Sequence, residues 1–369
     1  MTRERFHDLD ALRAFAMSLG IVLHACMYQI PLAVWPVQGE MALTVPAEHN
    51  PYFYVIALIH GFRMPLFFLL SGYFSAMLLG RRGIRGLLLH RWRRIGLPLL
   101  VFSLTIVPIT NKMFVPDEFN SLSGLLLLAL FGGFAHLWFL WNLLLIALGY
   151  LLAVKLGVRF RHGLWWLLVP LALVPQWLMT GQDFGADSPS TGIIPNFNNL
   201  LYYALFFLCG VLFFERRLEV RRRWLATMPA ALAVFPLALL FTYTSPAELG
   251  MHAWLHGLVS SVLQVAYCWL MCLGLMGLFR WVAHRERPWV RYLSDASYWL
   301  YVAHLPLVIL GQFLVVDMIE NVHVQVLLLC AGVTAILLLA YATCIRYTIV
   351  GAMLNGPRAR PGKSPQASV

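Results

Sequence analysis

The stretch LDALRAFAMSLGIVLHACMYQI, from Leu9 to Ile30, is the first of several apolar segments long enough to cross a lipid bilayer. It contains two ionisable side chains, Arg13 and His24, in a region where such groups are costly. A spacing of eleven residues is about three helical turns, so both side chains point the same way, roughly 16 Å apart along the axis. Ionisable groups within a membrane usually mark a substrate, ion or proton path. The stretch therefore predicts a spanning helix that carries part of a functional site.

The composition of the whole chain supports this interpretation. Of the 369 residues, 60% are hydrophobic and only 12% are charged, and the mean hydropathy is +0.74. Soluble domains carry about twice that charged fraction, so we expect an all-α, polytopic integral membrane bundle. The shorter apolar stretch 122–131 is expected to form an interfacial or re-entrant helix. About ten transmembrane helices are predicted, near residues 9–30, 52–79, 95–113, 134–154, 163–180, 197–214, 224–244, 255–283, 297–316 and 322–349.

The basic residues are distributed asymmetrically along these spans. If both termini are cytoplasmic, 24 of the 27 lysines and arginines fall in cytoplasmic segments, and most acidic residues fall in the opposite loops. This is the positive-inside pattern. The pI of about 9.6 therefore reflects topology, and nucleic acid is not expected as a partner. We predict a multi-pass membrane protein, in contact with the lipid bilayer and with both termini cytoplasmic.

The chain is expected to form one integral domain, residues 1–354. The remaining segment, 355–369, is basic and rich in proline, and we expect a disordered cytoplasmic tail. All six cysteines lie in apolar spans without a C-x-x-C motif, so neither a disulfide nor a metal site is expected. The sequence does not indicate an oligomeric state.

His24 is the first candidate for catalysis. An imidazole titrates near neutral pH and can take a proton from an attacking alcohol. A hydrogen-bonded structural histidine would explain His24 alone, but Arg13 on the same face favours a functional role. We therefore predict that His24 and Arg13 are catalytic.

Other ionisable and aromatic side chains fall inside later spans. Arg63, near the middle of the membrane and three residues after His60, needs either a buried acid or an anionic ligand as its partner. His304 lies in the middle of a later span, with Tyr298 and Tyr301 on roughly the same side. Such positions predict a polar cavity. The candidates for substrate binding are Arg63, His60, Tyr73, His136, Trp138 and His304.

The segment RRGIRGLLLHRWRRIGLP, residues 81–98, is the densest basic patch. It reads as an interfacial helix that touches anionic lipid. Arg91 and Arg94 are spaced i, i+3, and guanidinium groups suit phosphate and diphosphate oxygens. The functional alternative is therefore a phosphate clamp formed by Arg91 and Arg94.

Several of these motifs resemble those of a known family. Arg13 and His24 reproduce the R-x10-H signature in the first span of the membrane acyltransferase-3 family, and Arg91 and Arg94 fit its cytoplasmic R-x-x-R. FRMPLFFLLSGYF, HLWFLWNLL and DASYWLYVAHLPLV resemble further blocks of that family. Within it, the stretches from Phe6 to His24 and from His60 to Ser75 look most like the glucans biosynthesis protein C group.

The resemblance implies a mechanism. Acyl-CoA, in that group succinyl-CoA, would bind from the cytoplasm with its phosphates near Arg91 and Arg94. The acyl-pantetheine arm would enter the bundle past Arg13. His24 would activate a hydroxyl of a periplasmic glycan acceptor, such as an osmoregulated periplasmic glucan. Acyl-CoA is thus the expected donor, with no metal.

Two other classes of function remain open from the residues. A secondary transporter or flippase would also place histidine and arginine inside the membrane, but inverted repeats with broken helices in matching halves are not evident. A structural membrane subunit would not need several ionisable residues at mid-depth. The lack of a phosphate-binding Gly loop, H-E-x-x-H or G-x-S-x-G argues against an ATP-driven pump and a serine hydrolase.

Overall fold

The computed structural model describes residues 7–32, 35–114, 123, 133–158, 167–179, 184–186, 192–285 and 287–358. All regular secondary structure in these ranges is helical, which confirms the all-α membrane fold. Eight helical segments in them are long and apolar enough to span a membrane. These are α1 (His7–Met27); α3 (Pro51–Arg91) continued by the π-helix η2 (Trp92–Gly96) and α4 (Leu97–Ser103); η4 (Ala135–Leu137) with α7 (Trp138–Lys155); α10 (Phe197–Glu215); η6 (Arg222–Ala226) with α11 (Thr227–Tyr243); α12 (Ala253–Val282); α13 (Pro288–Met318); and α14 (Val322–Ala340) with η7 (Tyr341–Ile345).

Two of the ten expected spans are interrupted. The span at 95–113 is divided between α4 and α5 (Ile106–Lys112), and the span at 163–180 contains α8 (Leu168–Leu171) and α9 (Leu173–Leu178). Pro108 and Pro175 follow these two breaks. Because proline has no backbone N–H, the carbonyl four residues earlier loses its helical partner, which explains the position of both breaks.

Three short helices complete the described elements: α2 (Glu40–Thr44), η1 (Ala47–His49) and α15 (Ile349–Asn355). The expected interfacial or re-entrant helix at 122–131 lies outside the described residues, apart from Ser123.

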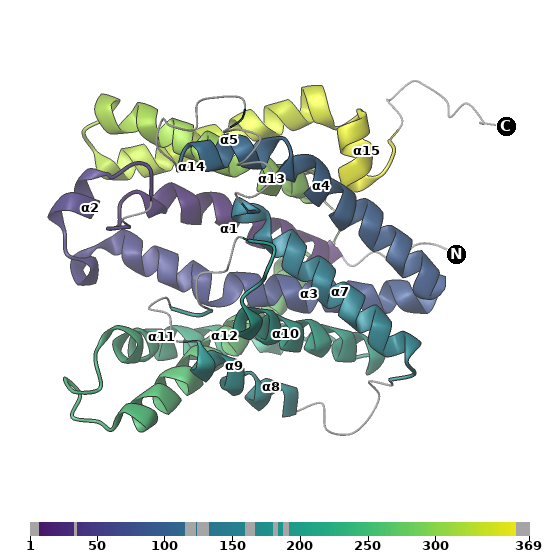
Figure 1. Ribbon diagram of the computed structural model, residues 1–369, viewed down its shortest axis with the longest axis horizontal. Helices are drawn as coiled ribbons and strands as arrows, with labels where there is room; N and C mark the ends of the chain where they lie inside the picture. The colour runs from purple at the N-terminus through teal and green to yellow at the C-terminus, as the bar shows by residue number, and fades with distance from the viewer. Residues whose placement is uncertain are drawn as a thin grey trace.

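Helix α1 lies in the middle of the bundle (Figure 1). It contacts α3, α12, α13 and α14. In Figure 1, α13 and α14 lie on one side of α1, and α3 followed by α10 and α12 lies on the other. A side chain on α1 can therefore meet residues from several distant parts of the chain.

Two glycines bring α3 and α10 into close contact. A Cβ atom on Gly72 would collide with the backbone oxygen of Phe207, and one on Gly210 would collide with the backbone oxygen of Leu69. Small residues allow this close approach of helices in membranes. This contact fixes the position of α3, the helix that carries Arg63.

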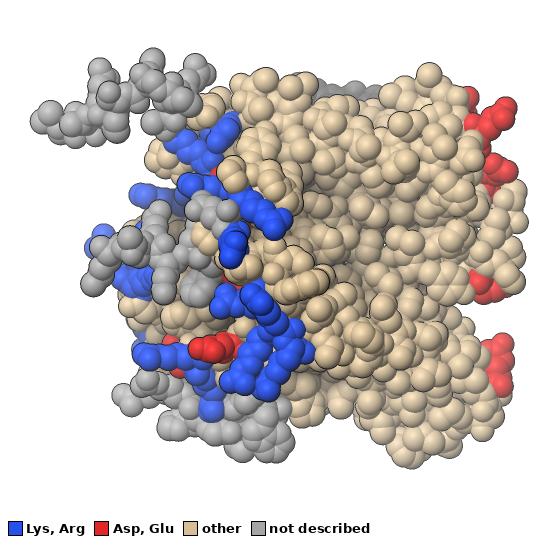
Figure 2. Space-filling model, turned by 180° about the vertical axis from the view of Figure 1, so that it is seen from behind, with Lys and Arg blue, Asp and Glu red and all other residues tan. Residues whose placement is uncertain are grey.

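The two ends of the bundle carry opposite charge. On the face seen in Figure 2, lysines and arginines gather at one end with a few acidic residues among them, and acidic residues alone are seen at the other end. Helix α1 begins at the basic end, and α15 ends there (Figure 1). The part of α3 before Gly83, residues 51–82, is about 48 Å long, so it extends beyond a hydrocarbon layer of about 30 Å. The helix bends at Gly83, whose φ of +66° glycine adopts without strain.

Candidate active site

Two histidines from different helices meet deep in the bundle. The Nδ1 atom of His24, on α1, lies 2.8 Å from the Nε2 atom of His304, on α13. The other ring nitrogen of His304, Nδ1, lies 2.7 Å from the backbone oxygen of Tyr301. The two histidines are 280 residues apart in the chain. The fold thus brings into contact two histidines that the sequence analysis identified as separate candidates.

His136 lies against the same pair. Its ring is nearly perpendicular to that of His304, with centroids 5.3 Å apart. Its Nε2 donates a hydrogen bond to the backbone oxygen of Val302 at 2.9 Å, and the Tyr301 hydroxyl donates to the backbone oxygen of His136 at 2.7 Å. The Val302 oxygen is available because Pro306, four residues later, has no N–H to offer it. Nδ1 of His136 is left as a buried atom without a hydrogen-bond partner among the described residues.

Arg63 fills a space that Gly20 leaves on α1. A Cβ atom on Gly20 would lie 2.5 Å from Nη1 of Arg63 and 3.8 Å from Nε2 of His304. Nε of Arg63 is buried without a hydrogen-bond partner, and no acidic side chain pairs with this guanidinium in the described ranges. Gly20 shares a helix face with Arg13 and His24. The Arg63 guanidinium therefore lies along that face between Arg13 and His24.

The three histidines differ in solvent exposure. His304 is 1% exposed and His136 is 7% exposed, whereas His24 and Arg63 keep part of their surface accessible. A substrate can reach His24 and Arg63 more readily than His304. His304 is buried against His24, and the expected role of His304 in binding substrate stays a prediction.

The sequence did not single out two further residues that hold His24. Gln312, on α13, donates through Nε2 to the backbone oxygen of His24 at 2.8 Å. Trp35 donates through Nε1 to Oε1 of the same glutamine at 3.0 Å, and its ring lies nearly parallel to that of His24, 6.1 Å away. The sequence signal for Gln312 was its position as a polar residue inside an apolar span. Trp35 has no comparable signal in the sequence.

The remaining candidates for substrate binding make other contacts between segments. Tyr73 packs edge-on against a phenylalanine of α10, with ring centroids 5.4 Å apart, and Trp138 packs against a tyrosine of the same helix at 5.8 Å. His60 donates through Nε2 to the backbone oxygen of Ala186 at 2.9 Å. These contacts link helices and a loop, and none of them reaches the His24–His304 pair. A role of these three residues in substrate binding stays a prediction.

Arg91 and Arg94 contact different helices. Arg91 is buried and donates to the backbone oxygen of Ser71 at 3.2 Å and to the hydroxyl of Ser75, both on α3. Arg94, within η2, donates to two backbone oxygens in the last turn of α15, at 3.3 and 3.2 Å. The π-helical turn that begins after Arg91 changes the register expected from an i, i+3 spacing. A role of the two arginines in binding phosphate stays a prediction.

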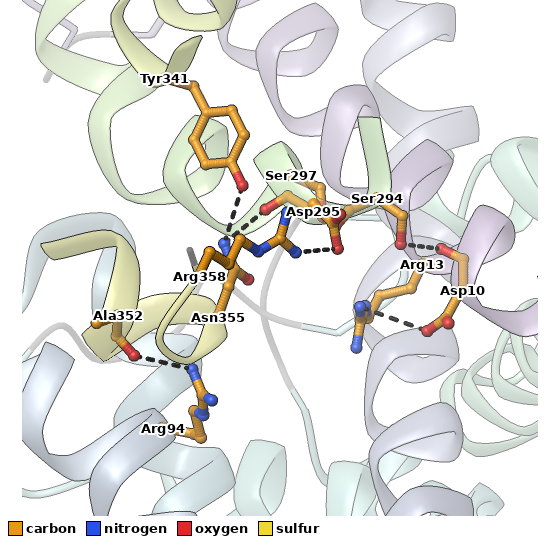
Figure 3. A network of polar contacts seen from close by, with 10 residues as sticks. All are labelled: Asp10, Arg13, Arg94, Ser294, Asp295, Ser297, Tyr341, Ala352, Asn355 and Arg358. Carbon is orange, nitrogen blue, oxygen red and sulfur yellow. Dashed lines mark hydrogen bonds and ion pairs between the residues drawn. The ribbon is translucent and has the colours of Figure 1, made fainter. Parts of the chain in front are cut away.

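Figure 3 shows two further arginines, Arg13 and Arg358, in one view with Arg94. Arg13 is 3.5 Å from Asp10 and remains partly exposed. Arg358 forms an ion pair with Asp295 at 2.7 Å, so the segment just after α15 is bound to α13, although we expected a disordered tail from residue 355. Residues 359–369 lie outside the described part. In the described ranges, no three metal-ligating side chains cluster.

Comparison with known proteins gives the family. Residues 6–343 match the family model described as an acyltransferase domain. The chain belongs to this acyltransferase family. The match includes every candidate site residue from Arg13 to His304, and it confirms the resemblance drawn from the motifs.

Two relatives match this acyltransferase over most of its length, and both are named for the biosynthesis of glucans. The glucans biosynthesis protein C of Escherichia coli O1:K1 / APEC is 27% identical over 332 residues, which cover 82% of each chain. The protein of the same name from Escherichia coli strain K12 is 26% identical over the same share of both chains. No solved structure matches the acyltransferase.

Proposed function

We propose that this acyltransferase moves an acyl group, preferably succinyl, from cytoplasmic acyl-CoA to hydroxyls of a periplasmic glycan such as an osmoregulated glucan. The observation that carries the proposal is the partly exposed histidine His24, which a second histidine holds inside a membrane bundle. The family and the names of the relatives supply the reaction class and the acceptor class.

The sidedness of the reaction follows from the positive-inside rule. The end of the bundle that carries the basic residues is assigned to the cytoplasm (Figure 2). Residues 1–354 form the transmembrane acyltransferase domain, and 355–369 form a cytoplasmic tail. Arg13, near the basic end, then faces the donor, and His24 is more than halfway toward the acceptor. The membrane in question is the bacterial inner membrane.

The chemistry requires one proton to move twice. His24 takes the proton of an acceptor hydroxyl as that oxygen attacks the thioester carbonyl carbon. The new C–O bond forms, the C–S bond breaks, and His24 returns the proton to the departing CoA thiolate. The products are an ester and free CoA thiol, so no external oxidant or reductant is needed.

The donor is held by cations along its route. Arg91 and Arg94 bind the CoA diphosphate, and their present partners are neutral hydroxyl and carbonyl oxygens, for which an anionic phosphate can substitute with a stronger, charge-assisted bond. Arg13 guides the pantetheine arm.

Arg63 binds the distal carboxylate of a succinyl group. Its guanidinium lies beside His304 and has no acidic partner among the described residues. A buried cation of this kind is stabilised when a ligand brings the opposite charge. Because Gly20 and His24 are one helical turn apart, roughly 6 Å along the axis, a short dicarboxylic acyl group can span from Arg63 to the reacting carbonyl.

The experiment is to incubate purified protein with a panel of acyl-CoA donors, with and without candidate glucans, and to quantify free CoA by chromatography. Glucan-dependent release of CoA, largest with succinyl-CoA and absent in a folded His24→Ala variant, is the expected result. Movement of an intact substrate across proteoliposomes without any release of CoA would instead favour a transporter. No release with any donor and acceptor would refute the proposal.

A further inference from the structure

The hydrogen bonds around His304 determine which ring nitrogen of His24 is free to react. We propose that His304 is a positioning residue that fixes the tautomer of His24, so that Nε2 of His24 is the atom that takes the proton of the acceptor hydroxyl. This inference rests on the proposed acyltransferase function.

The argument begins at the backbone. The oxygen of Tyr301 can only accept a hydrogen bond, so Nδ1 of His304, 2.7 Å away, must carry a proton. In a neutral ring the other nitrogen carries no proton, so Nε2 of His304 can only accept a hydrogen bond. Its partner at 2.8 Å, Nδ1 of His24, must therefore be the donor. The lone pair of a neutral His24 is left on Nε2.

Both rings are neutral in the resting enzyme for an electrostatic reason. The Arg63 guanidinium lies against Gly20, beside His304. A second positive charge on either imidazole would face this cation in an interior of low dielectric constant, where repulsion between charges is strong. The tautomer chain from Tyr301 to His24 therefore describes the form that meets the substrate.

The geometry of α13 makes His304 suited to this task. The ring is 1% exposed, so water does not compete for its nitrogens. Gln312, about two turns later on the same helix, holds the backbone oxygen of His24 at 2.8 Å. One helix thus fixes both the ring and the backbone of His24. When Nε2 of His24 takes the proton, the bond from its Nδ1 to His304 becomes charge-assisted and stronger.

The test compares three substitutions of one residue in the full-length protein. A glutamine at 304 can place its amide oxygen near the position of Nε2 and accept from His24, whereas leucine cannot accept at all. We expect His304→Leu to lower kcat by on the order of 10²–10⁴, the usual contribution of a general base, since loss of the orienting carboxylate costs about 10⁴ in the serine-protease triad. The KM for the acyl-CoA donor should change only a few-fold. The kcat of His304→Gln should be at least about tenfold higher than that of His304→Leu. If His304→Leu does not fold, His304→Asn replaces it, because the shorter side chain cannot reach His24, and it should show the low kcat.

His323 offers a matched control. Its Nδ1 lies 2.8 Å from the hydroxyl of Tyr52 and links α14 to α3 at the acidic end of the bundle. His323→Leu also removes a histidine bond between helices, and it should leave kcat unchanged. The inference is overturned if His304→Leu turns over like the wild type, or if glutamine loses as much kcat as leucine or asparagine in folded protein. Those results leave an active wild type, whereas failure of the wild type to release CoA from any donor refutes the proposed function itself.

Discussion

Replacing Arg63 by glutamine tests the proposed donor preference. The substitution keeps hydrogen-bond donors at a similar reach and removes the charge. Arg63 has a buried, unpartnered Nε and no acidic partner among the described residues, so its charge is available to the ligand. We therefore expect the variant to lose much more activity toward succinyl-CoA than toward acetyl-CoA, which lacks the distal carboxylate.

The size of the effect follows from the pair that would be lost. Removing one partner of a buried, hydrogen-bonded charge pair costs about 2–5 kcal/mol. At about 1.4 kcal/mol for each tenfold change in rate, kcat/KM for succinyl-CoA should fall by roughly 30-fold to several thousand-fold. Acetyl-CoA leaves the guanidinium unpaired in the wild type as well, so its kcat/KM should change only by a few-fold.

The assay measures kcat/KM for both donors from chromatographic quantification of free CoA, with the same glucan acceptor. Elution volume and melting temperature of the detergent-solubilised variant control for folding. Equal losses for the two donors in folded protein would refute the selectivity argument and assign Arg63 to general stabilisation of the thioester carbonyl. A loss confined to acetyl-CoA would refute it as well.

Two more predictions follow from the packing and the charge distribution. Gly20→Ala should displace the flexible end of Arg63 and lower succinyl transfer by at least about tenfold in a folded protein. Gly332→Ala, where an added Cβ meets nothing within 4 Å, should leave transfer unchanged. Similar rates for the two variants would contradict the placement of Arg63. Sidedness can be tested in a Cys344→Ser background, which removes the exposed native thiol. An impermeant thiol reagent, added to intact cells with a permeabilised outer membrane, should label Glu320→Cys but not Glu219→Cys. The opposite pattern would reverse the proposed sidedness.

Much of the fold can be predicted from the sequence because membrane helices leave a strong local signal. An apolar run of about 20 residues specifies a span by itself, and the arginine-rich loops predict its direction. The two interrupted spans carried a signal too, since Pro108 and Pro175 remove backbone donors from α5 and α9. The spacing of Arg13 and His24 likewise places both on one face of α1.

The assembly of the site could not be predicted in the same way, because it depends on contacts between distant segments. Nothing local to His24 indicates that its ring partner is His304, 280 residues away. The space at Gly20 looks like ordinary helix packing until Arg63 of α3 is placed in it. One signal was available and unused: Pro306 frees the backbone oxygen of Val302, which is the acceptor that His136 uses.

The most direct test of the account is transfer across the membrane in inverted vesicles, whose cytoplasmic face is outward and whose lumen is loaded with glucan. Labelled succinyl-CoA is added outside, and the label on the enclosed glucan is measured over time. We predict labelled glucan in the lumen with the wild type and a rate lower by about 10²–10⁴ with His24→Ala, the usual cost of removing a general base. Equal labelling by His24→Ala, or label only on glucan supplied outside, would contradict the claim that His24 passes a cytoplasmic acyl group to a periplasmic hydroxyl.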